Sequence, residues 1–262
     1  MIEPPQLVFI GSPTQDLVIR HGMARHAAGG AAFISALAAR WTGARVGVVA
    51  RVPVQLPIGC AETFGPGGLD RGGLRTMNGA LPGFRITYDE NDNAQYNAWS
   101  VGLEGGLSGS DIPDEWKSAW VHIAGIGASA AQQRRVLSAL PKDQIRGLSI
   151  GTCKAMIEES REDTLALLRA SDVFFLNEEE WSLLCPNGIP DGHAGTVVVT
   201  RGHNGVSVIS TNGTEHTPAI PTEVIDPTGA GDAFCGGYLG ALVGGSKQPP
   251  VDAGLRAASI VL

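Results

Sequence analysis

The stretch Asp226-Pro-Thr-Gly-Ala-Gly-Asp-Ala-Phe234 leads into an apolar segment and is the most informative part of this 262-residue chain. Gly229 and Gly231 lack a Cβ, so the backbone can turn sharply there and present successive N–H groups. We predict a helix from about Gly231 to Val243, and helix N-termini favour anions. Asp232, in the first turn, can accept a proton from a hydroxyl that attacks a phosphoryl group held there. The alternative is that Asp232 only caps the helix and that the glycines only form a turn.

Short apolar runs alternate with helical patterns along the rest of the chain. Buried strands are predicted where an apolar run ends at a turn, and helices where apolar residues recur every three or four positions. The predicted strands are Leu7–Ile10, Val46–Ala50, Trp120–Ala124, Val173–Leu176 and Val197–Thr200. Besides the helix after Gly231, the predicted helices are Ala31–Trp41, Ala130–Leu140, Thr164–Ala170 and Glu178–Leu184. This alternation predicts an α/β fold, with a mostly parallel sheet covered by helices on both faces.

Two regions depart from the alternation. Residues 53–75 are rich in Pro and Gly and are expected to form an extended passage on the surface. Phe84, Ile86 and Tyr88 alternate with polar residues, and Gln95–Val101 follows after a polar turn, so residues 84–101 predict an antiparallel hairpin. A small β-sheet of this kind on an α/β body is interpreted as a lid over a substrate.

Charge and composition limit the classes of partner. The chain has 19 Lys and Arg against 26 Asp and Glu, a net charge of −7, which gives no electrostatic reason to bind nucleic acid or an anionic membrane. No apolar run is long enough to span a bilayer, and the N-terminus lacks the pattern of a signal peptide. The four scattered cysteines are expected to be reduced thiols. We therefore expect a cytoplasmic protein that acts on a small molecule.

The segment Asp226–Phe234 resembles the D-T-x-G-A-G-D-x-F signature of the ribokinase-like carbohydrate kinases, also called the PfkB family. Further resemblances follow in the order expected for that family: Gly11-Ser12 through Asp16, Gly29-Gly30, Asn177-Glu-Glu-Glu180 and Thr200-Arg-Gly202-His-Asn-Gly205. The resemblance implies one ribokinase-like kinase domain over residues 1–262, in three α/β/α layers, with a small β lid from about 12–28 and 76–101.

The resemblance also implies a reaction, the transfer of the γ-phosphoryl group of ATP to a hydroxyl of a small sugar-like substrate. Asp232 would be the general base, and the amides of Gly229, Ala230 and Gly231 would form the anion hole. Asp16, Gly29 and Gly30 would bind the substrate, whereas the nucleotide would contact Asn177, Thr200, Gly202, Gly205 and Lys154. Glu180 would hold Mg²⁺ through water. A monovalent cation such as K⁺ near residues 226–231 and a homodimer through the lid are further expectations of this resemblance.

Several of these residues also have a structural interpretation. Glu178–Glu180 has the pattern of an acidic first turn that is stabilised by the helix dipole. Asp16 can be a loop carboxylate in water, and Lys154 can be a solvated surface cation. The turn Thr200–Gly205 is by itself a generic connection between two strands.

The chain departs from the family pattern at three places. Ile34 stands where the family usually has an Asn that contacts the substrate, which indicates a less polar or differently oriented acceptor. The run Ser149-Ile-Gly151-Thr-Cys-Lys154 replaces a strand end that often reads Asp-x-Asn. Only 30 residues (262 − 232) follow Asp232, which is short for the family. Whether Ile34 and Gly151 reduce or redirect the activity is open.

Three other functions compete with a sugar kinase. Gly125-Ile-Gly127-Ala-Ser-Ala130 matches G-x-G-x-x-G/A and raises an NAD-binding hypothesis, although no acidic residue closes a strand at the expected distance. A nucleoside kinase of the same fold is the second alternative. The third is a non-catalytic relative that binds a sugar or nucleotide as a regulator.

Overall fold

A large central sheet organises the protein. The computed structural model describes residues 3–65, 67–89, 94–224, 226–244 and 246–261. Within these residues the sheet has nine strands in the order β13-β12-β11-β10-β9-β8-β1-β4-β5. They are β1 (Leu7–Ile10), β4 (Val46–Pro53), β5 (Leu74–Met77), β8 (Trp120–Ala124), β9 (Gly147–Gly151), β10 (Val173–Asn177), β11 (Thr196–Thr200), β12 (Val206–Ser210) and β13 (Gly213–Thr217). The seven strands from β5 to β11 in this order run parallel to one another, and β12 and β13 extend the sheet in antiparallel orientation.

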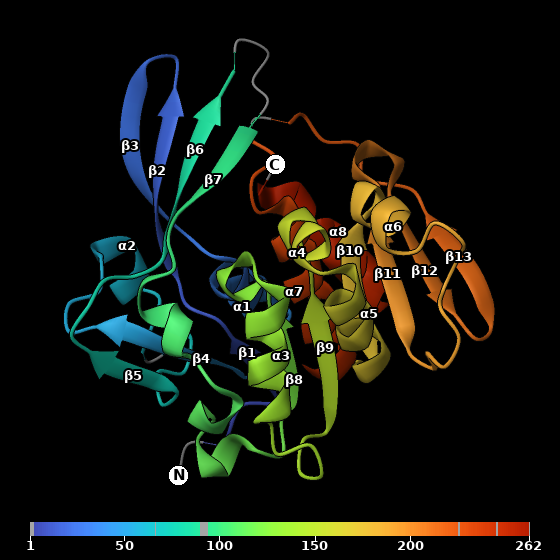
Figure 1. Cartoon of the computed structure of the whole chain (residues 1–262), viewed down its shortest axis with the longest axis horizontal. Helices are drawn as coiled ribbons and strands as arrows, with labels where there is room; N and C mark the ends of the chain where they lie inside the picture. Colours follow the sequence, from blue (N-terminus) through green and yellow to red (C-terminus); the bar gives the residue numbers. More distant parts are fainter. Residues whose placement is uncertain (1–2, 66, 90–93, 225, 245, 262) are drawn as a thin grey trace.

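Helices cover both faces of this sheet, as Figure 1 shows. One face carries α1 (Ala31–Trp41), α7 (Ala230–Gly244) and α8 (Pro250–Val261), and the other carries α3 (Ala130–Ser138), α4 (Lys154–Glu159), α5 (Arg161–Ala170) and α6 (Glu178–Leu184). Successive residues of a strand point to opposite faces. Accordingly, Leu7 and Phe9 of β1 pack into the core of the α1 and α7 side, whereas Val8 and Ile10 pack into the core on the other side. The predicted α/β fold is confirmed.

The region 53–75 differs from its prediction as a surface passage. It contains the short helix α2 (Ile58–Ala61) and strand β5, and Cys60 and Leu69 are fully buried. Its apolar side chains therefore extend the core on the α1 side. Elsewhere, short 3₁₀ helices occupy Gly102–Gly106, Gly109–Asp111, Asp114–Trp116, Ile126–Ala128 and Gly202–Asn204. All four cysteines are free thiols, as expected.

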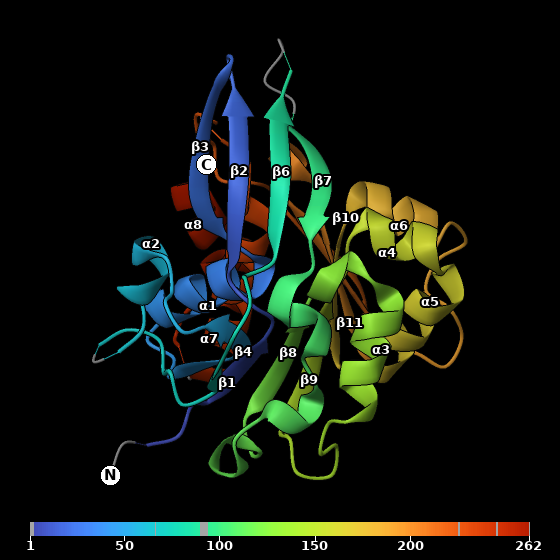
Figure 2. The same ribbon diagram turned by 60° about the vertical axis from the view of Figure 1, so that its left-hand side comes forward.

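A second, small sheet rises from the body, with the order β3-β2-β6-β7 (Figure 2). Its strands are β2 (Thr14–Arg20), β3 (Met23–Gly29), β6 (Gly83–Tyr88) and β7 (Ala94–Ser100). The hairpin predicted over 84–101 is present as β6 and β7, and β2 pairs with β6 in parallel. The turn of that hairpin, at 90–93, lies outside the described residues. Val18, Ile86 and Tyr88 form the small apolar cluster of this sheet.

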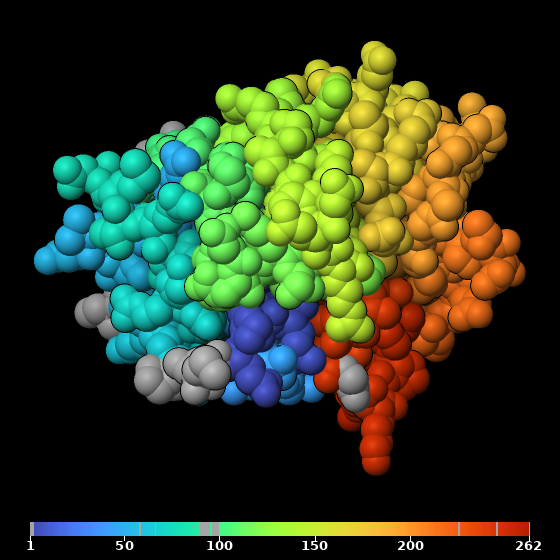
Figure 3. All heavy atoms as spheres, turned by 90° about the horizontal axis from the view of Figure 1, so that it is seen from below, coloured from blue at the N-terminus to red at the C-terminus, as the bar shows by residue number. Residues whose placement is uncertain are grey.

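The strand order reverses at β1, with β4 and β5 on one side and β8 to β11 on the other. In open α/β sheets, ligands bind at the carboxyl edge beside such a switch point. The small sheet rises from this same edge, because β2 follows β1 directly. Figure 3 shows the opposite end, where the N-terminal segment (blue) lies between the green segments and the red C-terminal helices. Among the described helices, none combines the length and apolar character needed to cross a membrane.

Candidate active site

The Asp226–Phe234 segment forms a turn followed by the first residues of α7. Gly229 has a φ of +81°, and a side chain there would bring its Cβ to 2.8 Å from Ile34 Cδ1. The Ala233 amide donates to the Gly229 carbonyl at 2.8 Å, which starts the helix. Only glycine fits this position without strain, since the φ is positive and α1 lies close.

The three amides that were expected to face an anion are not equivalent. Ala230 donates its N–H to the carbonyl of Pro227 at 3.2 Å, so this amide already has a partner. For the N–H groups of Gly229, Gly231 and Asp232, no acceptor is present among the described residues. The donors open to a ligand are therefore the N–H groups of Gly229, Gly231 and Asp232, and the expectation for Ala230 needs this correction.

Asp232 is partly exposed, yet its carboxylate accepts no hydrogen bond from any described residue. Desolvation by the surrounding protein raises its pKa to about 6. The interpretation of Asp232 as a capping residue is therefore wrong, because a cap accepts a backbone N–H. An ionised carboxylate without a hydrogen-bond partner is costly, and such groups are concentrated at functional sites.

The charge of Asp232 contributes to the raised pKa of Glu180 and to that of Cys153, so both groups lie within electrostatic range of Asp232. Desolvation is the main cause that raises the pKa of Glu180 to about 7. Its carboxylate accepts the Asn177 N–H at 2.9 Å, and Asn177 Oδ1 accepts the Glu180 N–H at 2.9 Å. This reciprocal capping box fixes the start of α6. The structure thus supports the capping interpretation for Glu180 and places its carboxylate within electrostatic range of Asp232.

This pair of carboxylates is compatible with Mg²⁺. Oxygen ligands are what this ion prefers, and it needs only one or two carboxylates when water and phosphate oxygens complete its coordination. The like charges of Asp232 and Glu180 also oppose the ionisation of Glu180, an effect that a divalent cation would relieve.

The predicted nucleotide-binding residues lie at adjacent strand ends. Asn177 and Thr200 are register partners at the carboxyl ends of β10 and β11. Gly202 and Gly205, both with positive φ, form the turn between β11 and β12. Lys154 is half exposed, and its Nζ lies 2.6 Å from Glu179 Oε1. The ammonium of Lys154 is therefore part of a surface ion pair, which agrees with its structural interpretation.

Arg201 is a second cation at this edge and was not singled out in the sequence. Its guanidinium pairs with Glu178 and donates from Nε to Ser207 Oγ at 2.9 Å. Arg201 directly follows Thr200 within the predicted nucleotide-binding turn, and this position could have indicated it from the sequence.

The predicted substrate-binding residues are also brought together. Asp16 is 8% exposed, which excludes a carboxylate in open water. It accepts the Thr14 hydroxyl at 2.9 Å and the Phe84 N–H at 3.0 Å, but burial still raises its pKa. A Cβ on Gly29 would overlap the Asp16 carboxylate, and Gly30 is the N-cap of α1.

The hydroxyl of Tyr88 was missed in the sequence, because its partners are far away along the chain. It lies 2.7 Å from Asp226 Oδ1 and 2.7 Å from Thr228 Oγ1. This contact connects the small sheet to the turn that precedes α7. The alternation of β6 placed Tyr88 on the inner face of the hairpin but carried no information about what it meets.

Glu104 is a buried carboxylate that no motif indicates. Its oxygens accept the Ser12 N–H at 2.7 Å and the Gly127 N–H at 2.8 Å. These amides belong to the loops after β1 and β8, so Glu104 bridges the two strands at the switch point. Burial raises its pKa in spite of both hydrogen bonds.

The geometry of residues 125–130 argues against an anion site for NAD. Gly127 donates to Glu104, and Gln133 Oε1 accepts the Ile126 N–H at 3.1 Å. At the start of α3, Glu159 accepts the Ala130 N–H at 2.6 Å. Since these donors already have acceptors within the chain, the helix N-terminus has little left to offer a pyrophosphate.

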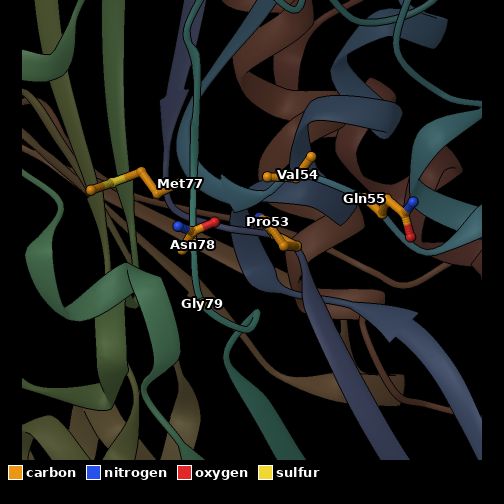
Figure 4. A pocket seen from close by; sticks show the side chains of 6 residues that line it. All are labelled: Pro53, Val54, Gln55, Met77, Asn78 and Gly79. Atoms are coloured by element: carbon orange, nitrogen blue, oxygen red, sulfur yellow. The ribbon is translucent and has the colours of Figure 1, made fainter.

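A pocket of about 360 Å³ lies between the segments that follow β4 and β5 (Figure 4). It is lined by Pro53, Val54, Gln55, Met77, Asn78 and Gly79. None of these residues is among the predicted site residues.

Comparison with known proteins agrees with the resemblance. Residues 152–262 match the family model "pfkB family carbohydrate kinase". The chain is 29% identical to a cytidine kinase of Thermococcus kodakarensis over an alignment that covers 95% of this chain and 92% of that one. A nucleoside kinase of Burkholderia thailandensis in complex with inosine has a TM-score of 0.76 at 20% identity, covering 97% of this chain and 89% of that one. A putative ribokinase II of E. coli in complex with ATP and Mg²⁺ also has a TM-score of 0.76, at 21% identity, covering 97% and 90%.

The fold and these similarities indicate a ribokinase-like kinase, a phosphotransferase with a hydroxyl group as acceptor. Residues 152–262 are therefore similar to the PfkB family of carbohydrate kinases, and the relatives that align with the chain are named as cytidine kinase, nucleoside kinase and fructokinase.

Proposed function

We propose that this protein transfers the γ-phosphoryl group of ATP to a hydroxyl of a small sugar or nucleoside, with Asp232 as the general base. The observation that carries the proposal is the Asp232 carboxylate, which has no partner, is desolvated, and lies at a helix N-terminus beside open N–H groups. A pure binding protein has little need of a base at this position, so we favour an enzyme over a regulator.

The proposed mechanism follows from these groups. Asp232 removes the proton of the acceptor hydroxyl as it attacks the γ-phosphorus. The N–H groups of Gly229 and Gly231 donate to the transferring phosphoryl oxygens. Glu180 and Asp232 would hold Mg²⁺, which would supply positive charge for the phosphates. Asp16 orients the acceptor at the root of the small sheet, which we propose acts as a lid.

A nucleoside acceptor is the second candidate, and two observations favour it over a hexose. Ile34 lies against Gly229 and offers no polar contact to a sugar. A cytidine kinase aligns with 95% of the chain, whereas an E. coli fructokinase aligns with 52% of it. A panel of sugars and nucleosides with Mg-ATP, assayed by ADP release, separates the two.

The decisive test of the base is Asp232→Asn. We expect turnover to fall by about a hundredfold or more, the range of general-base catalysis, while ATP binding stays within about threefold. Calorimetric titration with ATP measures binding, and the ADP assay measures turnover. An undiminished rate in Asp232→Asn would show that the base is misassigned, and binding without turnover in the unmodified protein would favour the regulator.

K⁺ dependence and dimerisation through the small sheet stay predictions from the resemblance. Replacing K⁺ by a bulky organic cation in the kinase assay tests the first. Light scattering of the purified protein tests the second.

A further inference from the structure

Tyr88 stands at the last position of β6, whereas the strand starts at Gly83 at the root of the small sheet. The two positions are five residues apart along the strand, a distance of about 16 Å. The hydroxyl of Tyr88 reaches Asp226 and Thr228, which lie 138 and 140 residues further along the chain. The contact is therefore made at the far end of the small sheet, where movement about the root would be largest.

The turn that Tyr88 contacts lies in the connection between β13 and α7. The stretches 218–224 and 226–229, between β13 and α7, contain no helix or strand. Figure 1 shows the chain after β13 running over the top of the large sheet toward the small one. Within the turn, the Thr228 N–H donates to Asp226 Oδ1 at 3.0 Å, the same oxygen that Tyr88 contacts. Gly229 follows immediately, so the position of this turn determines where the open N–H groups point.

Arg20 completes the contact from the neighbouring strand. Its guanidinium carbon lies 5.2 Å from the centre of the Tyr88 ring, a cation–π geometry. Desolvation alone would raise the pKa of Asp226, but the hydrogen bonds from Tyr88 and Thr228, with the charge of Arg20, lower it. Asp226 is therefore held ionised, and an ionised acceptor makes the stronger hydrogen bond to the tyrosine.

We propose that Tyr88 is a positioning residue that couples closure of the small sheet to the placement of the Gly229 and Gly231 amides and of Asp232. When the small sheet moves away, the hydroxyl leaves Asp226 and Thr228, and the turn loses its outer support. Phosphoryl transfer then becomes efficient only after the acceptor has been enclosed, which keeps water away from the activated phosphate. The effect on phosphoryl transfer rests on the proposed function. The support of the turn by Tyr88 does not depend on that function.

The test is Tyr88→Phe, which removes the hydroxyl and keeps the ring over Arg20. We expect kcat to fall by about tenfold or more while ATP affinity changes little, because the loss acts on the placement of the turn. Tyr238→Phe is the matched control, because Tyr238 packs in the core against Phe175, away from the turn, and it should leave kcat unchanged. Thr228→Val should be less than additive with Tyr88→Phe, since both changes break one contact.

Hydrogen exchange provides a readout that does not need a known acceptor. In Tyr88→Phe without ligands, the hydrogen-bonded amides of Thr228, Ala230 and Ala233 should exchange at least about threefold faster, and those of β8 should not change. Unchanged exchange at these three amides would overturn the inference, whatever happens to the rate. Faster exchange in a protein that phosphorylates nothing would support the coupling and reject the proposed function.

Discussion

Asp232 and Glu180 are two carboxylates whose pKa values lie close to neutral pH, at about 6 and about 7. Asp232 lies on the first turn of α7 and Glu180 on that of α6, so the two elements bring the groups together only in the folded chain. Desolvation is the main cause of both raised pKa values, and the charge of Asp232 adds a smaller contribution to that of Glu180. The proposed base must be unprotonated to work.

We therefore predict that kcat/KM rises with pH through an apparent pKa near 6. Stability should change in the opposite direction. Both pKa values are raised above those of the unfolded chain, so the stability these groups contribute is present below about pH 4 and is lost as the pH rises through 6 and 7. Initial rates and thermal unfolding between pH 5 and 8 measure both. A flat rate profile in this range would contradict the assignment of the base.

At the scale of single residues, the sequence indicated candidate site residues but not the partners of their hydrogen bonds. The motif indicated Gly229 and Asp232 because it matches a family signature, although glycine and a carboxylate also begin many helices that bind no ligand. It could not show that the Ala230 amide bonds to Pro227, since that depends on the shape of the turn. Tyr88 and Glu104 were missed because their partners lie tens of residues away, and spacing carries no information about such contacts.

At the scale of elements, α1 and α7 pack closely and thereby fix the position of Asp232. A Cβ on Gly236 would overlap the carbonyl oxygen of Ser35, so the two helices approach at backbone contact. Ser35 Oγ also donates to the Asp232 carbonyl at 2.8 Å. The start of α7 is thus tied to α1 by a hydrogen bond and by a close approach that only glycine permits.

We predict that Gly236→Ala destabilises the protein by about 1–3 kcal/mol through overpacking and also lowers kcat, because α7 must move away from α1. Gly59→Ala is the control, since its Cβ would lie 3.8 Å from Ala28 Cβ, an ordinary contact. Urea unfolding gives the free energies, and the kinase assay gives the rates. Equal stability of the two variants would contradict the importance of this packing.

The elements themselves were largely predictable where the apolar pattern was strong. Strand β1 and helices α1 and α6 have the predicted bounds, because each buries one regular stripe or run. Helix α8 was not predicted, although Pro250 at its first position is a known start signal. The burial of Cys60 and Leu69 was unexpected, because Pro and Gly around them suggested a surface loop.

At the scale of the whole molecule, Glu104 holds together the two halves of the large sheet at the switch point. Its two oxygens accept one N–H each from the loops after β1 and β8. A glutamine at position 104 has only one acceptor oxygen. Its NH₂ group would then face the second backbone N–H, and that donor would lose its acceptor.

We predict that Glu104→Gln lowers the free energy of unfolding by about 1–3 kcal/mol, the cost of a buried unsatisfied donor. The KM for the acceptor should rise as well, because the loop after β1 leads to Asp16. Glu115→Gln, at an exposed position, is the control and should change neither quantity. Urea midpoints and acceptor titrations provide the measurements, and a stability equal to that of the control would refute the bridge.

The small sheet is assembled from two stretches of chain, β2 with β3 and β6 with β7, which the body elements α1, β4, α2 and β5 separate. Pairing β2 with β6 joins residues such as Val18 and Ile86, so a loop of nearly seventy residues must close before the strands can meet. Contacts of such long separation form slowly and late. The core closes over still longer spans, because Leu7 pairs with Trp120 and Ser35 bonds to Asp232. During synthesis, the strands of the small sheet therefore emerge before the core can be completed, and the proposed base on α7 is added last.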